Sequence, residues 1–169
     1  HIYRYQDFKN TNGILTIHNL GYQGQYSKEN FQSFGIDWNL YYGAGFEHHG
    51  GINLLQAGIT SADMITTVSP TYANEIQTAE GGFGLDGLLR VRRDVVCGIL
   101  NGVDLRSWNP KTDKRIPKNY DFKTIKDKAI NKKALQEKFG LEVNPDIPLF
   151  GIVTRLADQK GIAELFAPT

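Results

Sequence analysis

Short apolar runs recur along the chain, and each ends at polar residues. Runs of this length, rich in β-branched and other apolar residues, are typical of strands buried in a parallel sheet. The sequence predicts four such strands, over residues 13–18, 63–68, 95–100 and 148–154.

Segments with helical spacing of apolar residues lie between and beside these strands. Helices are expected over residues 53–62, 70–77, 85–92 and 129–139, and another is expected to begin after Gly161. Ser69 and Pro70 form a favourable helix start, because the hydroxyl can cap free amides and proline loses no needed hydrogen bond there. Gly140 occupies a favoured stop position. Strand and helix alternate, which predicts an α/β fold with parallel strands.

Residues 21–51 lack a sustained period and hold many glycines and aromatics. A long loop is expected here, with one short helix around residues 28–34. Loops of this length are usually functional. The aromatic side chains could stack on sugar rings, although packing is the commoner role for aromatics this frequent. They are Tyr22, Tyr26, Trp38, Tyr41, Tyr42 and Phe46.

Composition and charge exclude several classes of function. The chain has 169 residues, 40% of them apolar, which permits a globular core. Nineteen basic and 18 acidic residues leave a net charge of +1, so we expect no nucleic-acid or membrane partner. No apolar stretch approaches the roughly 20 residues that span a bilayer. The single cysteine, Cys97, fits a buried strand thiol in the cytoplasm better than a nucleophile or zinc ligand.

Ligands of open α/β sheets bind beyond the carboxyl ends of the strands. The last predicted strand is followed by Arg155 and Lys160, which precede the helix that begins after Gly161. Free amides and the helix dipole favour an anion at such a turn, and arginine can hold phosphate oxygens through two donors. The alternative, that both are solvated loop charges, stays open at this point.

Other candidates carry weaker signals. His18 could be a general acid or base, a donor to a ligand hydroxyl, or a satisfied polar residue at a strand end. Asp104 could bind a sugar or, more commonly, form a turn. His48 and His49 lack the spacing of a zinc site and are expected at the surface. Residues 81–84, Gly-Gly-Phe-Gly, lack the ending of a phosphate loop and predict a flexible turn. No metal site is expected.

Taken in order, these segments resemble one family, the bacterial glycogen synthases and plant starch synthases of glycosyltransferase family 5. Residues 16–24, TIHNLGYQG, resemble its histidine–asparagine segment, and residues 67–76 its valine–serine–proline helix start. Residues 98–113 are similar to its interdomain signature, and residues 155–161 to its diphosphate-binding turn. The resemblance runs along nearly the whole chain.

The resemblance implies a GT-B architecture with two Rossmann-like domains, no cofactor and no required metal. Residues 1–100 would be the C-terminal part of the first, starch synthase catalytic domain. Residues 101–169 would be the hinge and the start of the second, nucleotide-sugar-binding domain. The family's Lys-x-Gly-Gly-Leu motif and its downstream glutamate motif are missing from the chain. We therefore expect a fragment truncated at both ends that is inactive by itself.

By the same resemblance, the parent enzyme would transfer glucose from ADP-glucose or UDP-glucose to the non-reducing end of an α-1,4-glucan, with retention of configuration. It would be cytoplasmic in a bacterium and plastidial in a plant. Two alternatives remain, a non-catalytic nucleotide- or glucan-binding remnant and another GT-B transferase such as a sucrose-type synthase. Residues 16–19 and 100–104 argue against the sucrose-type enzyme.

The resemblance also implies individual roles. Arg155 and Lys160 would neutralise the leaving nucleotide diphosphate as catalytic residues. His18, also catalytic, would hydrogen-bond the transferred glucose with support from Asn19, and Asn101 would approach it from the hinge side. Four more residues fall in matching segments and are expected near the substrate, the first two of them one layer behind it: Tyr22, Gln23, Gly102 and Asp104.

Overall fold

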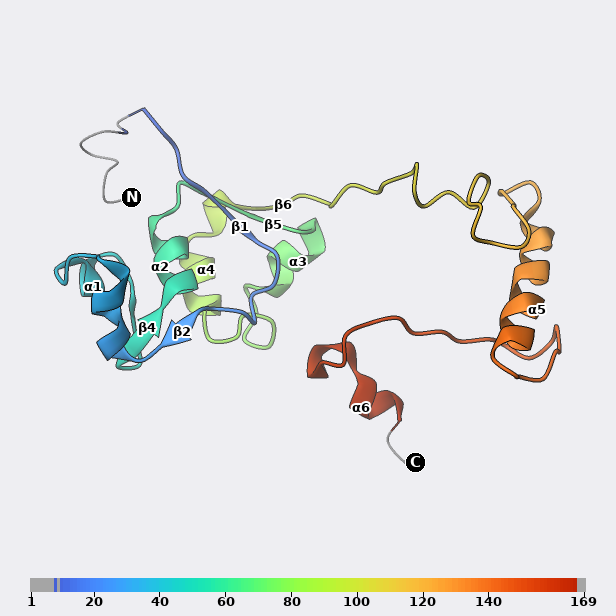
Figure 1. Ribbon diagram of the computed structural model, residues 1–169. Helices are drawn as coiled ribbons and strands as arrows, with labels where there is room; N and C mark the ends of the chain where they lie inside the picture. Colours follow the sequence, from blue (N-terminus) through green and yellow to red (C-terminus); the bar gives the residue numbers. More distant parts are fainter. Residues whose placement is uncertain (1–7, 9, 167–169) are drawn as a thin grey trace. The chain divides into compact units, whose positions relative to one another are not determined.

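The structure is a computed structural model that describes residues 8 and 10–166 (Figure 1). The expectation that the chain is truncated at both ends concerns termini that lie outside the described residues. The chain divides into two compact units, His1–Gly102 and Val103–Thr169.

A parallel sheet organises the first unit. Its strand order is β1 (Ile14–Ile17), β5 (Met64–Thr67) and β6 (Val96–Gly98), with β5 in the centre. β1 and β6 both run parallel to β5. These strands confirm three of the four predicted strands.

The helices of this unit also confirm the predicted pattern. They are α2 (Leu54–Ser61), α3 (Pro70–Glu75) and α4 (Asp86–Val91), followed by the 3₁₀ helix η2 (Arg93–Val95). The Ser69 hydroxyl accepts a hydrogen bond from the backbone N–H of Tyr72 at 2.9 Å, which is the predicted cap of α3.

The main core lies where these helices pack on the sheet. Figure 1 shows α2, α3 and α4 beside the strands of this sheet. Each fully buried leucine or isoleucine contributes roughly 1.5–3 kcal/mol through removal of apolar surface from water. The buried residues are Ile17, Leu20, Ile59, Ile65, Ile76, Leu85 and Leu89.

The region predicted as one long loop is more ordered than expected. It forms a second, antiparallel sheet in the order β2 (Gln25–Tyr26), β4 (Gly51–Asn53) and β3 (Glu47–His48). The prediction of a loop was wrong for these residues. Strands of two or three residues are too short to show alternating apolar and polar positions in the sequence. The expected short helix is present as the 3₁₀ helix η1 (Lys28–Phe34), and α1 (Leu40–Gly43) was not predicted.

Several aromatics in this region make ring contacts with one another, although only Phe31 and Tyr41 among them are buried. Phe31 and Tyr41 are buried with ring centroids 5.2 Å apart, and Phe46 lies 5.2 Å from Phe31. The Tyr41 hydroxyl donates to the carbonyl of Gly51 at 2.7 Å. This confirms the packing interpretation for Tyr41 and Phe46, whereas Tyr22 remains 62% exposed.

Helices alone make up the regular structure in the described part of the second unit. They are η3 (Ile125–Asp127), α5 (Lys128–Lys138), η4 (Asp158–Lys160) and α6 (Ile162–Leu165). Gly140 follows α5 in the left-handed region with φ +65°, and α6 begins after Gly161, both as predicted.

The strand predicted over residues 148–154 is wrong for the structure, which shows no strand in the described part of this unit. The side chains of Phe150 and Val153 are exposed. A strand exists only through hydrogen bonds to a neighbouring strand, and the apolar run alone cannot supply that partner.

Candidate functional site

The carboxyl edge of the parallel sheet is the candidate site of the first unit. His18 and Asn19 directly follow β1, and Asn101 lies three residues after β6. The Thr67 hydroxyl donates to the Ile17 carbonyl at 2.7 Å, and the Ile99 N–H donates to the Thr67 carbonyl at 2.7 Å. These two bonds tie the three strand ends together, so the segments carrying His18 and Asn101 leave the same edge.

The turn after β1 presents His18 to solvent. Asn19 accepts a hydrogen bond from the Gly21 N–H at 2.9 Å on its side-chain oxygen. Leu20 is fully buried, and its N–H donates to the Tyr72 hydroxyl at 3.1 Å. The buried leucine therefore anchors the turn, and the exposed histidine beside it is available to a ligand.

Gln23 has its side chain turned into the protein. It is 7% exposed, and its Nε2 donates to the Phe83 carbonyl at 3.0 Å. Its Oε1 accepts from Asn53 Nδ2 at 2.6 Å and from Gln25 Nε2 at 3.0 Å. This amide therefore shapes the loop from within, in keeping with a position one layer behind a substrate.

Asp104 forms a turn at the start of the second unit. Its Oδ1 accepts from the backbone N–H groups of Arg106 at 3.0 Å and Ser107 at 3.1 Å. Hydrogen bonding from Ser107, and then from the Arg106 backbone, lowers the pKa of Asp104 below its ordinary value. The turn-forming alternative is confirmed for this residue, and the neighbouring Asn101 and Gly102 are exposed.

Arg155 and Lys160 lie in the second unit, and both are exposed. Lys160 ends η4, where its N–H donates to the Ala157 carbonyl at 2.9 Å. Gly161 then takes φ +64° and α6 begins. Arg155 lies in the irregular segment before η4 and Lys160 at the end of η4, whereas His18, Asn19 and Asn101 belong to the first unit.

Metal ligation has no support among the described residues, where no three His, Cys, Asp or Glu side chains gather. His48 Nδ1 lies 2.6 Å from Gln56 Oε1 and is half-buried, whereas His49 is exposed as predicted. Cys97 is a half-buried free thiol in β6. None of the described helices is long and apolar enough to cross a membrane.

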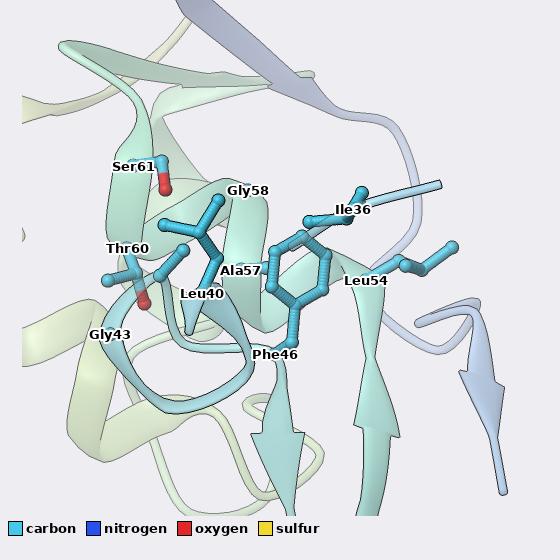
Figure 2. Close-up of a pocket in the computed structure, with 10 residues that line it drawn as sticks. Ile36, Leu40, Gly43, Phe46, Leu54, Ala57, Gly58, Thr60 and Ser61 are labelled. Carbon is cyan, nitrogen blue, oxygen red and sulfur yellow. The ribbon is translucent and has the colours of Figure 1, made fainter. Parts of the chain in front are cut away.

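A hollow of about 600 Å³ lies between α1 and α2 (Figure 2). Leu40 and Phe46 face it from one side and Ala57 from the other, and Thr60 and Ser61 add hydroxyls. No titratable side chain lines this hollow. Its lining extends along α2 from Leu54 to Ser61 and includes none of the residues that follow β1, β5 or β6.

A second hollow, of about 450 Å³, adjoins the turn after β1. This hollow is open to solvent and is lined by Gly21, Tyr22, Gln23, Gly24, Gln25 and Phe83, of which Tyr22 and Phe83 are exposed and Gln23 is buried. Phe83 was not among the predicted site residues, because residues 81–84 predicted a flexible turn. A phenylalanine between glycines was the only local sign of a functional position. Tyr22 is 61 residues away in the sequence, so the sequence could not show that the two residues line the same hollow.

Comparison with known proteins places these features in context. The family model of the starch synthase catalytic domain matches residues 1–91. A glycogen synthase of Treponema denticola is 54% identical over 162 residues, which cover 96% of this chain and 33% of that protein. A glycogen synthase of Rhodopseudomonas palustris is 51% identical over 149 residues, which cover 88% of this chain and 31% of that protein.

The fold has a close counterpart among solved structures. The catalytic domain of starch synthase IV from Arabidopsis thaliana, bound to ADP and acarbose, matches with a TM-score of 0.82 at 36% identity. The match covers 97% of this chain and 34% of that one. It confirms the α/β, Rossmann-like fold class of a GT-B glycosyltransferase. The chain spans about a third of the length of each of these relatives.

Proposed function

Because the chain belongs to the glycogen and starch synthase family, we propose that it is the central part of an α-1,4-glucan synthase. The enzyme would move glucose from ADP-glucose or UDP-glucose to the non-reducing end of the glucan, with retention at the anomeric carbon. One observation carries the proposal, namely the 54% identity to a glycogen synthase along 96% of the chain. The bacterial relatives and the free thiol of Cys97 favour the bacterial cytoplasm.

The proposal assigns the two parts of the chain to two domains. Residues 1–100 would complete the first Rossmann-like domain, and residues 101–169 would form the hinge and open the nucleotide-sugar-binding domain. The compact units of the structure, which meet at Gly102 and Val103, support a division near this point. The relatives are about three times as long, so the rest of both domains would come from sequence outside this chain.

Arg155 and Lys160 would act on the donor. When the glycosidic bond to the diphosphate breaks, negative charge builds on the leaving phosphate oxygens, and fixed cations stabilise that charge in the transition state. Both side chains are exposed in the segment that leads into α6, which supports this role. Removal of either should cost a few kcal/mol of barrier, on the order of 10²-fold in rate.

His18, Asn19 and Asn101 would hold the transferred glucose. Their common position at the carboxyl edge of the sheet supports the assignment, because ligands of α/β sheets bind there. The ADP and acarbose bound to the Arabidopsis relative favour an adenosine nucleotide sugar and a saccharide acceptor for this chain as well.

A chimera tests the proposal. This chain would replace the matching third of the Treponema denticola glycogen synthase, to which it aligns over 162 residues. Transfer of labelled glucose from ADP-glucose or UDP-glucose into glycogen is the expected result. A folded chimera that binds glycogen or nucleotide without transfer would support the remnant alternative, and sucrose formation with fructose as acceptor would support the sucrose-type alternative.

A further inference from the structure

Asparagine followed by glycine occurs twice in the chain, at Asn12–Gly13 and at Asn101–Gly102. In such a pair the backbone nitrogen of the glycine can attack the side-chain carbonyl carbon of the asparagine, because glycine has no Cβ to obstruct the approach. The attack requires that the glycine N–H loses its proton and that the backbone can bring the two atoms together. The surroundings of each pair therefore decide whether it reacts.

The Asn12–Gly13 pair is held by the residues at the start of β5. The Gly13 N–H donates to Oδ2 of Asp63 at 2.7 Å, and the Gly13 carbonyl accepts from the N–H groups of Asp63 at 2.9 Å and Met64 at 3.3 Å. A carboxylate acceptor favours the intact N–H over its deprotonated form, and the three hydrogen bonds fix the backbone before β1. Both effects oppose an attack on Asn12.

The Asn101–Gly102 pair lies in an open, irregular segment. Residues 99–104 are exposed and belong to no helix or strand. Among the described residues, none accepts a hydrogen bond from the Gly102 N–H or pairs with the Asn101 side chain. A Cβ atom at Gly102 would meet no atom within 4 Å, so the space beside this glycine is open as well. Solvent can therefore take the proton from the Gly102 N–H, and the backbone can adopt the geometry of attack.

We infer that Asn101 is a site of spontaneous deamidation and that Asp63 protects Asn12 from the same reaction. The Gly102 N–H gives its proton to a base in solution, and the nitrogen forms a bond to Cγ of Asn101. The bond from Cγ to Nδ2 breaks, and ammonia leaves after taking up a proton from solvent. Water then opens the cyclic imide at either carbonyl carbon, which gives aspartate or isoaspartate. One water molecule is consumed and one ammonia released, and no oxidant or cofactor takes part.

Peptide mapping by mass spectrometry tests this inference on the 169-residue chain. During incubation at mildly alkaline pH, Asn101 should become about 1 Da heavier, the difference between an amide and a carboxylic acid. Conversion of Asn12 should be at least about tenfold slower, which is the effect of one hydrogen bond to a charged acceptor. In urea both pairs should convert at similar rates, because the unfolded chain lacks the contact with Asp63. Equal rates in the folded chain, or an undiminished difference in urea, would overturn the inference.

Two variants assign the difference to individual groups. Gly102→Ala fits without a clash, and its Cβ should slow the conversion of Asn101 severalfold. Asp63→Ala removes the acceptor of the Gly13 N–H and should accelerate the conversion of Asn12, in a chain whose circular dichroism spectrum shows that it is folded. An Asn101 rate that Gly102→Ala leaves unchanged would refute the imide route. An Asn12 rate that Asp63→Ala leaves unchanged would refute the protection.

Deamidation of Asn101 has one consequence that rests on the proposed function. Asn101 is proposed to hold the transferred glucose, and a carboxylate has no donor to replace the two of the amide. In the active chimera, kcat should therefore fall in proportion to the converted fraction of Asn101 during storage. A chimera that keeps its kcat after Asn101 has converted would overturn the role of Asn101 in glucose binding. The mass measurement does not depend on activity, so failure of the proposed function and failure of the modification site are distinguishable.

Discussion

The glycine at position 98 lies directly against the backbone of Ser69. A Cβ atom on Gly98 would overlap the Ser69 carbonyl, so no side chain fits where the end of β6 passes the start of α3. This close approach positions the chain that continues to Asn101 beside the first turn of α3. The packing of β6 against α3 therefore requires a residue without a Cβ atom at position 98.

Gly98→Ala should consequently destabilise the first unit. Because the overlapping atoms belong to the backbone, β6 or α3 would have to shift, and we expect a loss of about 3 kcal/mol in the free energy of unfolding. Urea unfolding followed by circular dichroism measures it. Gly43→Ala is the matched control, since a Cβ there meets no atom within 4 Å and should change stability little. Equal stability of both variants would contradict the close approach.

Asn53→Ala should be costly for a different reason. Asn53 is fully buried, caps α2 and donates to Gln23, so its removal leaves an uncapped amide and an amide oxygen short of one donor. The expected loss is about 2 kcal/mol in the free energy of unfolding. Asn39 precedes α1 but makes no side-chain cap, so Asn39→Ala should have a much smaller effect in the same urea experiment. Similar losses from the two variants would contradict this role.

The turn at Asp104 should weaken in acid. Hydrogen bonds from Ser107 and Arg106 lower the pKa of Asp104, so the carboxylate stabilises the turn above its ordinary pKa of 3.8. That contribution is lost as the pH falls through the lowered pKa. The amide proton of Ser107, followed by NMR, should titrate with a midpoint below 3.8. Asp104→Asn keeps an oxygen acceptor and should remove this titration, whereas a midpoint at or above 3.8 would contradict the turn.

The sequence predicted the elements whose signals are local. β1 and β5 are apolar runs between polar turns. Ser69 is the N-cap of α3, and Pro70 is its first residue. Each signal lies within a few residues, and the core that covers it is in the same unit. Local patterns of this kind agree with the final fold because burial and capping favour the same answer.

Elements that depend on distant partners were missed or wrong. The strands of the second sheet are two or three residues long and exist only through pairing across residues 25–53. The strand expected over residues 148–154 has the right composition, but the described part of the second unit holds no strand to pair with it. Pairing is a property of the whole chain, so the apolar pattern alone could not decide either case.

The residues of the candidate site show the same contrast between local signals and relationships between distant positions. Motif resemblance led to the proposal of His18 and Lys160 as site residues, because their segments are contiguous in the sequence. It could not reveal that Gln23 is buried behind the loop or that Phe83 shares a hollow with Tyr22, since these relationships join positions about sixty residues apart. Burial and cavity shape become visible only in three dimensions.

In the proposed chemistry, Lys160 stabilises the leaving diphosphate. The kcat of Lys160→Gln in the chimera is the most direct test of this role. Glutamine keeps a polar side chain, one atom shorter, and removes the charge, and the residue is exposed, so folding should not change. Lys126→Gln removes an exposed charge elsewhere in the second unit and serves as the control. We expect kcat with ADP-glucose and glycogen to fall about 10²-fold for Lys160→Gln and to stay unchanged for the control. Equal kcat values for the two variants would contradict the assignment of this turn to the leaving diphosphate.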